Sequence, residues 1–96
     1  RGMGSIAEIP RNADKTEGKG FFYCRIPAGK RKVAPTVWNP SDHDLLIKIQ
    51  VNELIEVSKF IPAKEMLSVE CPVNSENIKM TFKGNRKLVL LQTVFE

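Results

Sequence analysis

Cysteine and histidine are the side chains here best suited to chemistry, and the sequence has few of them. There are two cysteines, Cys24 and Cys71, and one histidine, His43, between Asp42 and Asp44. Neighbouring side chains of an extended loop point in different directions, so His43 and its two carboxylates do not favour a metal site. The sequence contains no phosphate-binding loop, dinucleotide fingerprint or nucleophile elbow. It therefore predicts a protein that is not an enzyme, with no catalytic residues, metal or cofactor.

The two cysteines have two alternative states. Cys24 and Cys71 each fall on the apolar side of an alternating segment, so both are expected to face the core. Buried thiols behave as small apolar side chains, which favours two reduced cysteines. In an oxidising compartment the same pair could instead form a disulfide between two sheets.

Aromatic rings near cations form the second group of candidate residues. Phe21 and Tyr23 fall on the polar side of their segment, and Trp38 lies in the next segment. If these two segments pair as a hairpin, the three rings share one outer face. Such rings could stack on sugars or bases, or anchor a protein contact. The predicted ligand or interface residues are Phe21, Tyr23, Trp38, Lys30, Arg31 and Lys32.

Residues 19–26 resemble in part the RNA-binding aromatic strand of RNA-recognition domains. The pattern is met at Lys19, Gly20, Phe21 and Tyr23, and it is not met at Phe22, Cys24 and Ile26. The resemblance would imply two helices, and no stretch of the sequence has helical spacing. Nucleic acid is therefore a disfavoured partner, and an oligonucleotide-binding barrel is a weak alternative.

Alternating apolar and polar residues predict about seven short strands. The predicted strands cover residues 21–26, 30–38, 44–52, 54–61, 67–73, 78–83 and 87–95. The third and fourth should form a hairpin, and Pro35 should place the second at a sheet edge or in a β-bulge. The expected fold is all-β, a single antiparallel β-sandwich of the immunoglobulin-like or jelly-roll-like type. The predicted core is Phe22, Cys24, Ile26, Val33, Val37, Leu45, Ile47, Ile49, Val51, Ile55, Val57, Leu67, Val69, Cys71, Ile78, Met80 and Phe82.

Length and composition are those of one small domain. The chain has 96 residues, 42% of them hydrophobic, and a formal net charge of +4. These values exclude a multidomain enzyme, a collagen and a membrane span. Residues 1–20 predict a flexible N-terminal arm, with residues 1–5 as a cloning remnant, and residues 21–96 predict the sandwich. The absence of a secretory signal favours an intracellular or virion-associated protein over a secreted one.

The last predicted strand is apolar on both faces. It is either an interior strand, or its second face meets another subunit through Val89, Leu91 and Phe95. The small core, the arm and this strand favour a non-catalytic module that forms a homo-oligomer or docks on a larger assembly. Accessory coat, fibre or tail proteins of viruses and phages are the expected class. The alternative function is a carbohydrate-binding β-sandwich module with a glycan partner.

Overall fold

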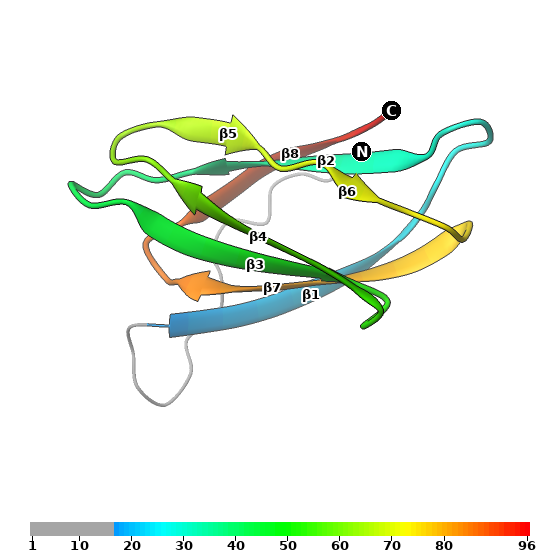
Figure 1. Cartoon of the computed structure of the whole chain (residues 1–96), viewed down its shortest axis with the longest axis horizontal. Coiled ribbons are helices and arrows are strands. Elements are labelled where there is room, and N and C mark those ends of the chain that lie inside the picture. Colours follow the sequence, from blue (N-terminus) through cyan, green and yellow to red (C-terminus); the bar gives the residue numbers. More distant parts are fainter. Residues whose placement is uncertain (1–16) are drawn as a thin grey trace.

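The computed structural model describes residues 17–96, which form two antiparallel β-sheets packed face to face (Figure 1). The first sheet has the spatial order β1 (Glu17–Arg25), β7 (Asn77–Asn85), β3 (Leu45–Val51) and β4 (Ile55–Ile61). In the second sheet, β2 (Lys32–Trp38) lies between β8 (Val89–Phe95) and the short strands β5 (Met66–Ser68) and β6 (Cys71–Pro72). The predicted all-β sandwich is confirmed. Within residues 17–96 there is no helix that could cross a membrane.

The core lies between the two sheets, and every residue that the alternation predicts there is either buried in it or packed against it. The rings of Phe22 and Phe82 stack with centroids 5.5 Å apart, because β1 and β7 are neighbours in the first sheet. Ile61, Leu88 and Leu90 are also buried in this core. Burial of these aliphatic and aromatic side chains is the main stabilising contribution to a domain of this size.

The first strand pairs with the seventh, not with the second. Phe22 lies opposite Met80 and Cys24 opposite Ile78, so apolar side chains of β1 and β7 line the same inner face. The chain then turns after Ile26 and enters the other sheet at Lys32. The hairpin between the first two strands, which was the condition for a shared row of rings, is therefore not formed. Both segments carry an apolar face, and the two faces meet across the core instead of side by side.

The second sheet is irregular around Pro35. This proline lies in the central strand β2 and not at an edge, and the bulge next to it has its extra residue in β8 and not in β2 as predicted. On one side the Val69 amide donates to the Pro35 carbonyl at 2.9 Å, between β5 and β6. Proline has no amide hydrogen to continue a ladder. The single strand predicted over residues 67–73 is accordingly split in two.

A bulge in β8 explains why its sequence is apolar on both faces. Val37 pairs with Leu90 and Pro35 pairs with Thr93, so two residues of β8 lie opposite Thr36. The extra residue shifts the alternation by one position. Leu90 faces the core before the bulge and Phe95 packs against the core after it. The shared outer face predicted for Val89, Leu91 and Phe95 is therefore wrong at Phe95.

The first strand begins at Glu17, inside the arm predicted over residues 1–20. Gly18, Lys19 and Gly20 pair with Gly84, Lys83 and Phe82 of β7. Two glycines carry no side-chain pattern, so the period of this strand is invisible in the sequence. The rest of the predicted arm, including the suggested cloning remnant, lies outside the described residues.

The hairpin of β3 and β4 is confirmed. Its turn has positive φ at both central residues, 54° at Asn52 and 62° at Glu53. The Leu54 amide donates to the Val51 carbonyl at 3.1 Å and closes the turn. Two left-handed residues are characteristic of type I′ turns, whose twist matches that of paired strands.

A buried asparagine holds the loop between β2 and β3. The Asn39 side chain has no exposed surface. Its Nδ2 donates to the carbonyls of His43 at 2.7 Å and Ile61 at 2.8 Å. Its Oδ1 accepts from the Ser41 amide at 2.9 Å and from the Ser41 hydroxyl at 2.7 Å. Because each polar atom of the amide is paired, its burial is compatible with a stable fold.

Candidate functional site

The outer face of the first sheet carries exposed aromatic rings together with several lysines. Strand alternation turns the residues between the core positions outward, and registers of β1, β7, β3 and β4 place them in rows. We call this surface the aromatic–lysine face. It consists of Lys19, Phe21, Tyr23, Arg25, Asn77, Lys79, Thr81, Lys83, Lys48, Gln50, Glu56 and Ser58, with Leu46 and Phe60 at its far end.

An exposed aromatic pair lies at one end of this face. Phe21 and Tyr23 are 57% and 70% exposed, unusually open for rings. Their centroids are 5.8 Å apart at an interplanar angle of 81°, an edge-to-face arrangement. The Lys79 Nζ lies 4.7 Å from the Phe21 centroid, within the range of a cation–π interaction. Because Lys79 covers part of Phe21, Tyr23 is the more open platform for a planar ligand.

A shallow hollow of about 580 Å³ adjoins the Tyr23 ring. Its polar lining comes from both neighbouring strands and includes Arg25, Asn77 and Lys79. Arg25 is held by Glu76, which accepts from its Nη2 at 2.9 Å and from its Nε at 3.2 Å. An aromatic wall with amide, guanidinium and ammonium donors is suited to a small polar ligand such as a sugar.

Of the predicted rings, Trp38 does not belong to this face. It lies on β2 of the second sheet, opposite Met66 of β5 and Val89 of β8, and it is 38% exposed. The row of Phe21, Tyr23 and Trp38, expected if the first two strands formed a hairpin, is not present, because β1 and β2 are in different sheets. The structure brings together only the first two rings.

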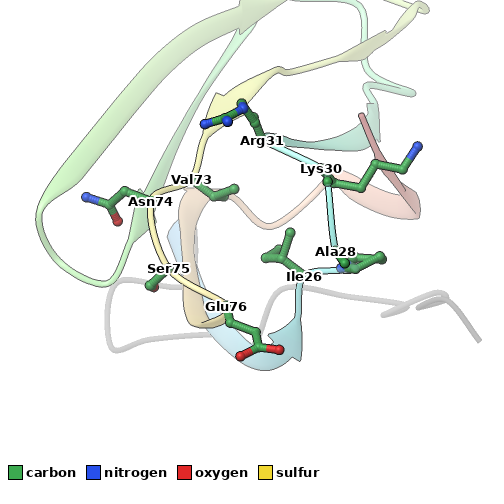
Figure 2. Close-up of a pocket in the computed structure, with 10 residues that line it drawn as sticks. Ile26, Ala28, Lys30, Arg31, Val73, Asn74, Ser75 and Glu76 are labelled. Carbon is green, nitrogen blue, oxygen red and sulfur yellow. The ribbon is translucent and has the colours of Figure 1, made fainter.

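The basic run of Lys30, Arg31 and Lys32 does not belong to the aromatic–lysine face either. Lys30 and Arg31 line a separate open hollow of about 370 Å³ between residues 26–31 and 73–76. Figure 2 shows Ile26 and Val73 on facing sides of it, with Lys30 and Asn74 extending away from it. Lys32 forms an ion pair with Glu70 at 3.4 Å. These charges diverge, so this hollow has no set of converging polar groups.

An apolar row crosses the outer face of the second sheet. Met66, Trp38 and Val89 lie directly opposite one another on β5, β2 and β8. Met66 is 54% exposed, and Val94 on β8 is 41% exposed. Of the predicted interface residues, Val89 belongs to this row and Leu91 lies at the bulge, whereas Phe95 packs against the core.

The two cysteines are free thiols in the structure, so the disulfide alternative is not formed. Cys71 is fully buried, and its Sγ lies 3.6 Å from the Val69 carbonyl oxygen. Burial raises the pKa of the Cys71 thiol to about 11, and it also raises the pKa of Cys24. High pKa values keep both thiols protonated and unreactive near neutral pH.

His43 is exposed in the loop before β3, where its backbone carbonyl accepts from Asn39. In residues 17–96, no group of three or more His, Cys, Asp or Glu side chains could hold a metal ion.

Sequence reasoning missed the lysines of the aromatic–lysine face as a group. The alternation already placed Lys48, Lys79 and Lys83 on outward faces. Their meeting depends on β7 lying between β1 and β3, and nothing local to a strand specifies that order. Asn77 was missed because it reads as part of a loop, although it pairs with Arg25 at the end of β1.

Comparison with known proteins gives one similar structure. No protein-family model and no curated protein sequence matches the chain. Among solved structures, the chain is similar to TmCBM61 in complex with β-1,4-galactotriose, with a TM-score of 0.49 and 16% sequence identity. The similarity covers 85% of this chain and 66% of that one.

Proposed function

We propose that the protein is a non-catalytic carbohydrate-binding module, and that a glycan binds on the aromatic–lysine face beside Tyr23. The exposed pair of Phe21 and Tyr23 is the observation that carries this proposal. Exposed rings on the solvent side of a sheet add nothing to the core. A ligand that covers them removes apolar surface from water, which favours binding.

Stacking of a sugar ring on Tyr23 has a simple physical basis. The weakly positive C–H groups of a pyranose ring pack against the negative face of an aromatic ring. Tyr23 is held in place from one edge by Phe21, whose ring meets it nearly at a right angle. A platform that is already ordered loses little side-chain entropy when a ligand binds.

Hydroxyl groups of the sugar would find donors and acceptors in the adjoining hollow. The Asn77 side-chain amide offers both kinds of group, and Arg25 and Lys79 offer donors. Glu76 fixes the direction of the Arg25 guanidinium through two hydrogen bonds. This combination gives orientation as well as affinity, since each sugar hydroxyl needs a partner when it leaves water.

Calorimetric titration with neutral and anionic oligosaccharides tests the proposal. Tyr23→Ala should lower the affinity for the bound glycan at least about tenfold, and Tyr23→Phe should retain most of it. Trp38→Ala is the matched control, because it removes an exposed ring from the other sheet. Failure of every oligosaccharide to bind, or equal losses from Tyr23→Ala and Trp38→Ala, would contradict the proposal.

A second candidate function is self-association through the second sheet. The row of Met66, Trp38 and Val89 favours it, because large apolar side chains lie adjacent on an outer face. Such patches on small proteins commonly mark contacts with another protein. We propose a second copy of this chain as the occupant.

The oligomeric state tests this second candidate. Sedimentation at tens of micromolar should give a dimer or larger species, and Trp38→Ser should shift it toward the monomer. A monomer at every concentration would exclude self-association, while leaving the carbohydrate proposal on the opposite sheet untouched.

A further inference from the structure

Three lysines lie side by side across the first sheet. Lys83 of β7 is directly opposite Lys19 of β1 and also directly opposite Lys48 of β3. Opposite side chains on one face have Cβ atoms about 5 Å apart, and like charges at this spacing destabilise a sheet. We call these three residues the lysine row. Its cost to folding indicates a role other than stability.

None of the ion pairs found among the side chains of residues 18–96 involves the lysine row. The ion pairs of this region join Arg25 to Glu76, Lys32 to Glu70 and Lys64 to Asp42. Glu56 of β4 shares the face, but it lies opposite Gln50 and accepts from Gln50 Nε2 at 3.3 Å. The positive charge of the row is therefore available to an anionic ligand.

The lysine row continues from the aromatic pair along the same strands. Lys19, Phe21 and Tyr23 alternate along β1, and Lys83, Thr81 and Lys79 lie opposite them on β7. Tyr23 is four positions after Lys19 in β1, a distance of about 13 Å at about 3.3 Å per strand residue. A chain molecule that lies along β1 and β7 would cover Tyr23, then Phe21, and then reach the lysine row.

We infer that the ligand of this face is an anionic polysaccharide, whose sugar rings stack at Tyr23 and whose carboxylate or sulfate groups bind the lysine row. This inference rests on the proposed carbohydrate-binding function. Lysine is a flexible point charge that suits either anionic group. Binding through several ammonium groups releases counterions, so affinity should fall steeply as salt rises.

A polysaccharide fits this face better than a nucleic acid does. Single-stranded nucleic acids need several open rings on which successive bases stack. Here the Lys79 ammonium lies over Phe21, and the other exposed ring of this face, Phe60 of β4, lies beyond the lysine row, so Tyr23 has no second open ring beside it. Besides Lys79 and Arg25 near Tyr23, three positive charges lie together in the lysine row, about 13 Å along β1 from that ring, so one open ring is combined with a separate cationic site.

Charge-matched double variants test the inference. Lys48→Gln with Lys83→Gln removes two charges from the row. Lys30→Gln with Lys87→Gln removes two exposed charges from loops outside this face. Both variants are titrated with oligogalacturonate, dextran sulfate, neutral cello-oligosaccharides and single-stranded oligodeoxynucleotide at low and physiological salt. Because the row consists of like charges, its removal should raise the melting temperature or leave it unchanged.

The row variant should lose about tenfold or more in affinity for oligogalacturonate or dextran sulfate, and the loop variant less than about threefold. The two anionic probes distinguish carboxylate from sulfate. Binding of neutral oligosaccharides alone, unaffected by the row variant, would overturn this inference and keep the proposed function. Tighter binding of the oligodeoxynucleotide, lost in the row variant, would assign the face to nucleic acid. No binding of any oligosaccharide would overturn both.

Discussion

The side-chain nitrogen of Lys79 lies 4.7 Å from the centroid of the Phe21 ring and belongs to the strand paired with that of Phe21. The same nitrogen is 6.0 Å from the centroid of Tyr23. One cation thus faces both rings of the exposed pair. It orders the two rings and joins them to the polar hollow next to Tyr23, so the aromatic and hydrogen-bonding parts of the site are one unit.

Trp38 should not sense a glycan that binds beside Tyr23. It is the single tryptophan of the chain and lies on the other sheet. In a fluorescence titration, we expect its emission to stay constant while calorimetry detects binding. Self-association through the second sheet should shift the same emission to shorter wavelength as the protein concentration rises. Quenching of Trp38 by a glycan would place the ligand on the second sheet.

Asn39→Ala should lower the free energy of unfolding by about 3 kcal/mol, because it leaves buried carbonyls and an amide unpaired. The side chain bonds to His43, Ser41 and Ile61 and has no exposed surface. Urea denaturation measures the loss. Asn74→Ala, the same change at an exposed asparagine, should alter stability by less than about 0.5 kcal/mol. Equal effects would contradict the role given to Asn39.

Stability should fall in alkaline solution because of Cys71. Burial raises the pKa of its thiol from 9.0 to about 11, so the folded state favours the protonated form. The stabilisation is complete below pH 9 and is lost as the pH rises toward 11. Cys24 acts in the same direction. Urea midpoints between pH 8 and 11 should decline more steeply for the wild type than for Cys71→Ala, and identical slopes would contradict the assignment.

Glu53→Gly should stabilise the β3–β4 hairpin. Glu53 has a φ of 62°, which strains a residue with a Cβ atom, and glycine adopts this angle freely. The expected gain is about 0.5–1 kcal/mol, and thermal unfolding measures it. Ser58→Gly in the middle of β4 should have the opposite sign, because glycine weakens strands. A loss of stability from both changes would argue against strain at Glu53.

Alternation within each strand predicts the strands and their core-facing residues, but it does not predict which strands pair with each other. Ile47, Ile49 and Val51 share a face because strand side chains have a period of two, whatever the topology. The pairing of β1 with β7 depends on contacts across more than fifty residues, so Trp38 was placed with the wrong rings. The bulge at Leu91 and Gln92 explains why the outer face predicted for β8 is wrong at Phe95, because one inserted residue reverses the faces beyond it.

The sequence predicts the aromatic part of the candidate site but not its lysines. Exposure of Phe21 and Tyr23 follows from the alternation of β1, and the structure agrees. The lysine row could not be predicted, because each lysine is an ordinary polar residue on its own strand. It becomes a feature only when three strands are placed in order.

Chemical-shift mapping by NMR on the ¹⁵N-labelled protein can locate a glycan on the aromatic–lysine face residue by residue. On titration with oligosaccharides, we expect amide shifts concentrated in β1 and β7, at residues 19–25 and 77–83, which carry Tyr23 and Lys79. The amides of β2, β5 and β8 should remain in place. Shifts concentrated in β2, β5 and β8, or no shifts with any oligosaccharide, would contradict glycan binding on that face.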